Sequence, residues 1–174
     1  MNDITSLQND CIIKQKRGLH FILASVVIWT AVLIIHLSPL SAATKSMLTF
    51  CCSTPLMPLA LLFSRIIKAG FQNKGNPLSN LGIILSIAQI PYLLIAMWTL
   101  SEVPDSFLMI YAMIFGAHLL PFGWLYNSKA YYILSAVIPI AVLIIGINLP
   151  SFTVAAFMLF VEIVFCAWLG IENK

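Results

Sequence analysis

Six long apolar segments, separated by short polar stretches, dominate this sequence. Their approximate bounds are 19–37, 47–64, 80–100, 106–126, 130–149 and 152–171. A helix of about 20 apolar residues crosses a hydrocarbon core about 30 Å thick, so each segment is long enough to span a membrane. Only 9% of the residues are charged, against about 25% in soluble domains. We therefore expect an all-α integral membrane bundle of six transmembrane helices over residues 19–171, with no separate soluble domain.

The basic residues are divided unequally between the two sides of such a bundle. If the N-terminus is cytoplasmic, only Lys45 of the nine lysines and arginines falls outside. The other eight lie in inner connections: Lys14, Lys16, Arg17, Arg65, Lys68, Lys74, Lys129 and Lys174. This asymmetry follows the positive-inside rule and predicts that both termini are cytoplasmic. The inner connections also account for the net charge of +3, so the charge does not indicate a nucleic-acid partner.

Both ends of the chain lie outside the predicted spans. In residues 1–18, Ile4, Leu7 and Cys11 are spaced to share one helical face, and basic residues follow at the membrane boundary. This pattern is typical of a short helix on the inner membrane surface, attracted to anionic lipid. A frayed tail is the alternative. Residues 172–174 form a short C-terminal tail.

The second apolar segment is predicted to be broken. Pro55 and Pro58 follow a polar run that begins at Thr49. Each proline lacks a backbone N–H, and within a membrane the carbonyls freed in this way need partners from side chains, neighbouring helices or water. We expect a departure from a straight helix between Thr49 and Pro58.

Short turns join the last three segments, which should therefore be antiparallel neighbours. On the fourth segment, Ala112, Gly116 and Gly123 form a face of small residues. Such faces allow close approach of helices in membranes.

Glu162 is the most informative polar residue because it lies near the middle of the sixth segment with no polar neighbour in the chain. An acid at mid-bilayer costs at least about 2.5–3.5 kcal/mol on insertion scales, so it needs a partner, a proton or water. The residue is interpreted either as functional or as a purely structural hydrogen-bonding group.

Two further polar residues are expected at a similar depth. At about 1.5 Å per residue, Glu162 lies about 15 Å from the outer edge, and His118 and Gln89 lie about 18 Å from it. Helical spacing adds Tyr111 to the His118 face and Tyr92 to the Gln89 face. These five residues form a hypothetical intramembrane binding cluster, in which we expect His118, Tyr111 or Gln89 to lie within direct or one-water reach of the Glu162 carboxylate. For His118 the alternative is a packing residue.

The sequence predicts no catalytic residues, metal site or cofactor. No metalloprotease, nucleophile-elbow, phosphate-loop or dinucleotide motif is present. The four cysteines include no pair spaced as in redox or zinc sites, and their pattern favours core packing.

Residues 14–29, 109–121 and 128–131 resemble an uncharacterised bacterial family of small multi-pass integral membrane proteins, a domain of unknown function. The resemblance extends over nearly the whole chain. It implies a bacterial cytoplasmic membrane and lends no site residues.

Three functions are compatible with these features. The leading hypothesis is a small transporter or permeation protein for an unidentified small molecule or ion, with the lipid bilayer as its surroundings and a homodimer as one expected form. The broken second segment and Glu162 motivate it. The competing hypothesis is a non-transporting regulator, sensor or self-protection factor that binds a protein or lipid. An intramembrane enzyme that uses His118 and Glu162 is the third.

Overall fold

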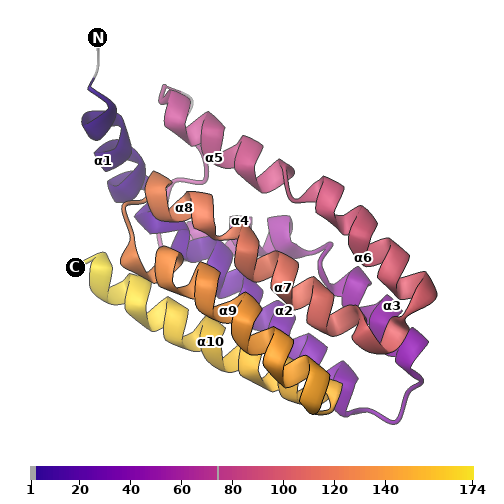
Figure 1. Cartoon of the computed structure of the whole chain (residues 1–174). Helices are drawn as coiled ribbons and strands as arrows, with labels where there is room; N and C mark the ends of the chain where they lie inside the picture. The colour runs from indigo at the N-terminus through magenta and orange to yellow at the C-terminus, as the bar shows by residue number, and fades with distance from the viewer. Residues whose placement is uncertain (1–2, 74) are drawn as a thin grey trace.

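The computed structural model describes residues 3–73 and 75–174, and the regular structure in these residues is entirely helical. Figure 1 shows the long helices running side by side, with the N-terminal helix and the C-terminus toward the same end. The elements in chain order are α1 (Ile4–Gln15), η1 (Lys16–Gly18), α2 (Leu19–Leu37), α3 (Ala42–Cys52), α4 (Leu56–Ile66), α5 (Pro77–Ile87), α6 (Ile90–Glu102), η2 (Pro104–Ser106), α7 (Phe107–His118), α8 (Leu120–Leu125), α9 (Lys129–Asn148) and α10 (Ser151–Glu172).

The helices have the length and hydropathy of a multi-pass membrane protein. Within the described residues, five helical stretches are long and apolar enough to cross a membrane, and α3 with α4 makes a sixth if the bent pair is one span. The five stretches are Ile4–Leu37, Pro77–Glu102, Pro104–Leu125, Lys129–Asn148 and Ser151–Glu172. The predicted all-helical membrane architecture is therefore confirmed at this level.

The second segment is broken, as its prolines predict. Helices α3 and α4 meet at an angle of 45° across a short break that contains Pro55. Two hydroxyls contact carbonyls at the end of α3: Ser53 Oγ donates to the Phe50 carbonyl at 2.6 Å, and Thr54 Oγ1 to the Cys51 carbonyl at 2.8 Å. Side chains thus supply hydrogen bonds where the helical ladder stops.

Two further breaks also accompany prolines. Helix α5 ends before Ala88 and α6 resumes just ahead of Pro91, while Leu119 separates α7 from α8 just ahead of Pro121. In contrast, Pro139 lies inside the continuous helix α9. A proline in this chain therefore does not by itself determine whether a helix is interrupted.

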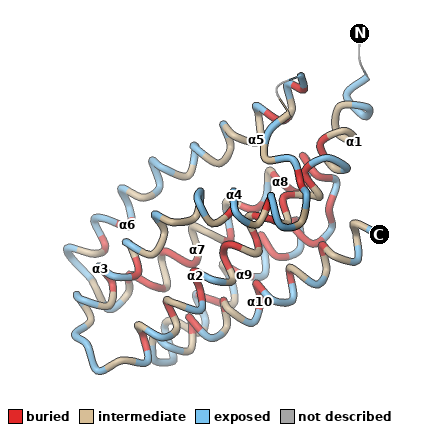
Figure 2. Tube along the Cα trace, turned by 180° about the vertical axis from the view of Figure 1, so that it is seen from behind, coloured by how far each residue is buried: buried red, intermediate tan, exposed pale blue. Residues whose placement is uncertain are grey.

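The core lies between α2, α7, α9 and α10, and the α5–α6 stretch lies at its edge. In the most apolar 18 residues of Pro77–Glu102, only 6% are buried, whereas 33–44% are buried in the corresponding part of the other four membrane-length stretches. Figure 2 shows the same contrast, with few buried residues along α5 and α6. Trp29, 1% exposed, packs in the core against Phe115 with ring centroids 6.1 Å apart.

Small residues allow α7 and α8 to approach α9 closely, as predicted. A Cβ added to Gly116 would lie 2.5 Å from Cγ2 of Ile138, and one added to Gly123 would lie 2.8 Å from the Tyr132 ring. Helix α9 also contacts α10. The last three segments are therefore neighbours, in agreement with their short connections.

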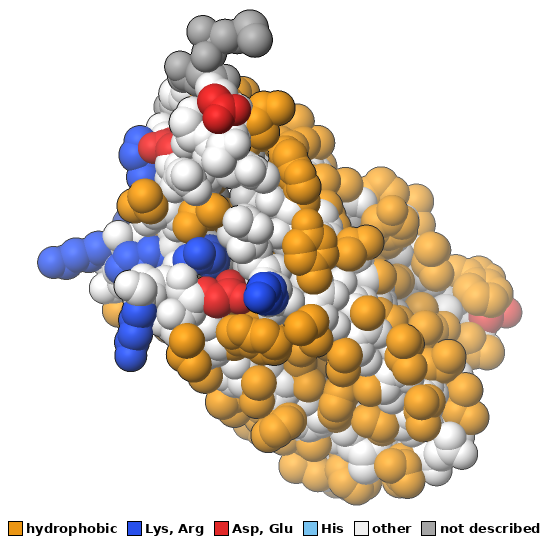
Figure 3. Space-filling model, turned by 60° about the vertical axis from the view of Figure 1, so that its left-hand side comes forward, with side chains coloured by type: hydrophobic (Ala, Val, Ile, Leu, Met, Phe, Trp, Pro, Cys, Tyr) orange, Lys and Arg blue, Asp and Glu red, His pale blue; other side chains and the backbone are white. Residues whose placement is uncertain are grey.

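The helix connections gather in two groups at opposite ends of the bundle. At one end, Lys16 Nζ donates to the Ile67 carbonyl at 2.6 Å, and Arg17 donates to the Glu172 carbonyl at 2.5 Å. At the other, Ser46 Oγ donates to the Pro104 carbonyl at 2.8 Å. We call the first the basic end, because Figure 3 shows lysines and arginines gathered there, and the second the opposite end.

Residues 4–15 form the predicted N-terminal helix, which is hydrogen-bonded to the rest of the protein. Gln8 Nε2 donates to the Trp124 carbonyl at 3.0 Å, and Asn76 Nδ2 donates to the Leu7 carbonyl at 2.8 Å. Cys11 is fully buried, whereas Ile4 is 60% exposed, so only part of the predicted apolar face contacts protein. The contact of this helix with a membrane surface stays a prediction.

A buried carboxyl and hydroxyl between α2 and α10

Glu162 is fully buried at the interface between the first and last long helices. Its Oε2 atom is hydrogen-bonded to Ser25 Oγ of α2. Its Oε1 atom is also buried and has no hydrogen-bond partner in the described part of the chain. A buried polar atom without a partner costs about 1–3 kcal/mol, and more if it is charged. The site therefore holds an acid with incomplete hydrogen bonding.

The Ser25 hydroxyl lies between two oxygen atoms. It is within 2.9 Å of the Ile22 carbonyl and is also hydrogen-bonded to Oε2 of Glu162. A serine hydroxyl has one proton to donate and can accept in other directions. Both contacts are satisfied together only when Glu162 carries a proton and donates to Ser25, while Ser25 donates to Ile22. When Glu162 is ionised, the Ser25 proton must turn toward the carboxylate.

The Ser25–Glu162 contact is one of three polar levels along an antiparallel seam between α2 and its neighbour α10. At the opposite end, His36 Nδ1 and Ser151 Oγ lie 3.0 Å apart. At the basic end, Arg17 Nε lies 3.6 Å from Glu172 Oε2. Ser25 and His36 are eleven residues apart on α2, as are Ser151 and Glu162 on α10. Eleven residues make about three turns, so both levels fall on one face of each helix.

Apolar layers separate the three levels. The antiparallel register places Trp29 and Val32 of α2 level with Met158 and Ala155 of α10, and all four are no more than 1% exposed. Toward the basic end, buried Ile22 and Phe165 form the next layer. Glu162 is thus enclosed by apolar side chains on both sides along the seam.

His118 has a partner other than Glu162. Its Nε2 atom lies 3.0 Å from the Leu85 carbonyl of α5. Four residues further along, the Gln89 N–H bonds to the Ser86 carbonyl instead, because the helix is interrupted between α5 and α6. His118 is therefore hydrogen-bonded to the Leu85 carbonyl, which the break leaves without its usual helical N–H donor. This arrangement favours the packing interpretation of His118.

The other predicted site residues are dispersed. Tyr111 stacks on Phe107 with ring centroids 5.7 Å apart. Gln89 lies at the α5–α6 break, and Tyr92 is 51% exposed on α6. In the described residues no direct hydrogen bond joins Glu162 to His118, Tyr111 or Gln89, and a contact through one water molecule stays a prediction. Similar depth along different helices does not determine which helices are neighbours. As a binding site the five residues remain a hypothesis.

Sequence reasoning missed Ser25, His36 and Ser151 as partners in the seam. A detectable pattern was present, since Ser25 and His36 are eleven residues apart in the first segment, and Glu162 of the last segment is eleven residues from Ser151, which directly precedes that segment. Serine and histidine are too common in membrane helices for that pattern to stand out without knowledge of which helices pair.

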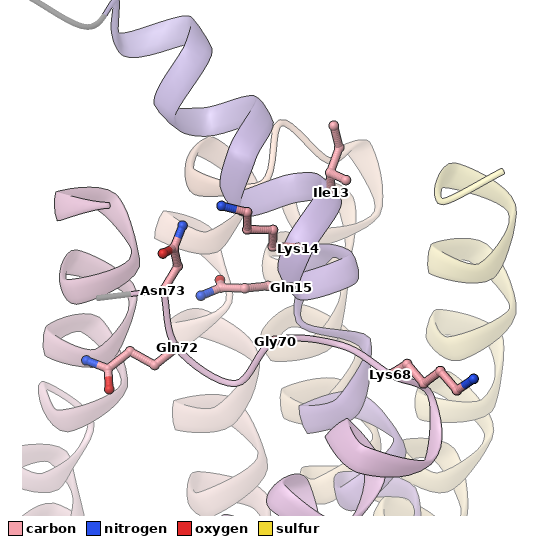
Figure 4. Close-up of a pocket in the computed structure, with 7 residues that line it drawn as sticks. All are labelled: Ile13, Lys14, Gln15, Lys68, Gly70, Gln72 and Asn73. Atoms are coloured by element: carbon pink, nitrogen blue, oxygen red, sulfur yellow. The ribbon is translucent and has the colours of Figure 1, made fainter. Parts of the chain in front are cut away.

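A cavity of about 480 Å³ lies at the basic end, away from Glu162. Figure 4 shows Gln15 and Asn73 directed toward it, whereas the Lys68 side chain points away. The amide groups are already used, since Gln15 donates to Ser79 at 2.8 Å and Asn73 donates to Asp10 at 2.5 Å. These contacts join α1 to the loop that follows α4 and to the start of α5, so among the described residues these two amide N–H donors are already used.

Comparison with known proteins places the whole helical region in one family. Residues 4–172 match the model of a family described as "Family of unknown function (DUF7010)". The chain belongs to this family. No curated protein and no solved structure matches the chain. Membership of the DUF7010 family confirms the resemblance to an uncharacterised family, and its description assigns neither an activity nor a compartment.

Proposed function

We propose that the protein is a small transporter or permeation protein of the bacterial cytoplasmic membrane that carries protons, alone or coupled to a small molecule or ion, through Glu162. One observation carries this proposal: Glu162 is fully buried beside Ser25, with its second oxygen unpartnered. A purely structural acid would be expected to have both oxygens satisfied.

The Ser25–Glu162 contact can accommodate two protonation states. In the protonated state the carboxyl donates to Ser25, and in the ionised state Ser25 donates to the carboxylate. The change in hydrogen bonding requires only rotation of the Ser25 hydroxyl, so the contact between Ser25 and Glu162 is kept in both protonation states. Ionisable groups inside membranes are typical of proton pathways.

The break between α3 and α4 is consistent with a transport function, because it would allow one of these helices to move beside the seam. Both halves of this segment contact α2, and Thr49 Oγ1 of α3 lies 3.1 Å from His36 Nε2. Interrupted helices are recurrent features of transporters because a break permits local movement near a pathway. Movement of α3 against α2 would alter the Thr49–His36 contact, and with it the His36–Ser151 contact at the opposite end of the seam.

The proposed topology has six crossings with both termini in the cytoplasm. It is supported by the division of the connections into two groups and by the lysines and arginines at one of them. The bilayer would cover the exposed apolar faces. A second copy in a homodimer is proposed as a further partner.

A specific observation favours the alternative, a non-transporting regulator or sensor. The apolar layers beside Ser25–Glu162 separate it from both ends of the seam in this conformation. A protein that responds to protonation without moving its ligand across the membrane would need no continuous path. The two functions therefore differ in whether protons cross.

Proton flux into proteoliposomes separates the two functions. With a trapped pH-sensitive dye and an imposed pH gradient, the wild type should transport protons, Glu162→Gln should not, and Ser25→Ala should be slower. Glu102→Gln is the matched control, because Glu102 is an exposed acid outside the seam. Equal flux through wild type, Glu162→Gln and empty liposomes would exclude the transport function.

A further inference from the structure

A second, smaller cavity lies at the opposite end of the bundle, directly above the seam. Its volume is about 140 Å³, and its polar lining comprises His36, Lys45, Ser46, Asp105 and Ser151. Because a water molecule occupies about 30 Å³ in the liquid, the cavity has room for about four waters or for a small polyatomic ion. Helices α2, α3 and α10 and the η2 turn all contribute to it.

Lys45 supplies the positive charge of this cavity. It is the one basic residue in the predicted outer connections, and its ammonium donates to the His36 carbonyl at 3.1 Å. An ammonium has three N–H groups, so two remain for a ligand. Among the described residues Lys45 forms no ion pair, although Asp105 also lines the cavity. The Lys45 side chain is partly buried, whereas Asp105 is exposed at the rim.

The start of α10 adds further donors beside Lys45. Ser151 is the first residue of this 22-residue helix, and Pro150 before it provides no side-chain cap. The first N–H groups of a helix lack helical partners and carry partial positive charge, which favours anions. At the start of α10 the Thr153 N–H is already bonded to the Pro150 carbonyl at 2.9 Å, so the N–H groups of Ser151 and Phe152 are the ones that this rule concerns. Ser46, in contrast, already donates to the Pro104 carbonyl at 2.8 Å. The remaining donors at this cavity are therefore those of Lys45 and of the α10 start.

We infer that this cavity binds a small oxyanion, a carboxylate or inorganic phosphate, with Lys45 as its charge partner. The volume limits the ligand to a few heavy atoms, and an anion is favoured where the half-buried Lys45 ammonium lies beside the start of α10, with the Asp105 carboxylate at the exposed rim. Its floor is the His36–Ser151 contact, three turns above the Ser25–Glu162 contact. A place for the anion on a transport path rests on the proposed function, whereas the binding itself does not.

Isothermal titration of the purified full-length protein in detergent tests this site. Potassium phosphate and potassium acetate are titrated separately at constant ionic strength. At least one should bind the wild type, and Lys45→Gln should weaken that binding about tenfold or more, as expected for loss of a charge-assisted hydrogen bond. Lys129→Gln removes an equal charge from an exposed lysine at the basic end and should not change it.

Two further variants keep the test decisive. Lys45→Arg retains the charge and should keep measurable binding even if Lys45→Gln folds poorly. Glu162→Gln should bind the anion like the wild type, so failure of proton transport and failure of anion binding are separable. Absence of binding by both anions to the wild type, or unchanged binding in folded Lys45→Gln, would overturn the inference.

Discussion

Ser25 and Glu162 depend on each other for their hydrogen bond between helices. Removing either side chain's polar group leaves the other buried with one partner fewer. Coupling energies for such contacts in membrane proteins average about 0.6 kcal/mol and reach about 1.7 kcal/mol. We expect a double-mutant cycle of Ser25→Ala and Glu162→Leu to give a coupling free energy in this range, measured by reversible unfolding in mixed micelles.

Ser135 offers the control for that cycle. It is a buried serine whose hydroxyl bonds locally to the Tyr132 carbonyl at 2.8 Å on its own helix. Ser135→Ala should therefore show no coupling to Glu162→Leu. Equal coupling for Ser135 and Ser25 would mean that the Ser25–Glu162 contact contributes nothing specific.

At this scale the sequence indicated which acid is unusual but not what it contacts. Glu162 could be found because burial of an isolated acid is costly wherever it occurs. Its partner depends on the pairing of α2 with α10, whose residues are more than a hundred positions apart. The role of His118 likewise depends on a helix break in α5–α6, and residue type alone does not indicate it.

Close packing of α7 on α9 requires the absence of a side chain at Gly116. A Cβ there would lie 2.8 Å or less from Cγ2 and Cβ of Ile138. Overpacking of this kind costs about 1–3 kcal/mol, and we expect Gly116→Ala to lower the free energy of unfolding by that amount. Gly170 of α10 has no atom within 4 Å of an added Cβ, so Gly170→Ala should be neutral or slightly stabilising.

Docking of α1 is expected to weaken in acid because of Asp10. Hydrogen bonds from Lys14, Asn76 and Asn73 hold the pKa of Asp10 below its usual value of 3.8. A lowered pKa in the folded state gives stability that is present above the unfolded pKa and is lost as the pH falls through the folded one. A spin label at position 13, which is 75% exposed, should gain mobility as the pH falls below the usual Asp pKa of 3.8 and through the lower pKa of Asp10 in the folded protein.

The Asp10→Asn variant is the control for this pH effect. Its α1 label should show mobility that no longer changes with pH across the same range, since the titrating group is gone. A wild-type label whose mobility is constant in acid would contradict the role assigned to Asp10.

Elements were predictable where local chemistry determines them. The break at Pro55 coincides with two prolines and a polar run, and the close α7–α9 approach follows from small residues. The interruptions at Ala88 and Leu119 were not predicted. A nearby proline is not sufficient to predict a break, because Pro139 lies inside the continuous helix α9. Packing against neighbouring helices decides between these outcomes.

The six-span map applies to the molecule as a whole and can be tested by labelling. Single cysteines are introduced into a cysteine-free background and exposed to an impermeant thiol reagent outside intact cells. Positions 103 and 150 should react, whereas positions 129 and 174 should react only after the membrane is permeabilised. Position 74, also predicted to be inside, lies outside the described residues. Labelling of position 129 from outside would overturn the map.

Protonation of Glu162 in the folded protein is the central claim, and infrared difference spectroscopy in lipid bilayers measures it directly. We predict a carboxyl band that is gained and lost reversibly as the bulk pH is changed. The band should be absent in Glu162→Gln and shifted in Ser25→Ala, because Ser25 is hydrogen-bonded to Glu162 Oε2. If the wild type and Glu162→Gln give the same difference spectrum throughout the pH range in which both stay folded, Glu162 does not exchange a proton.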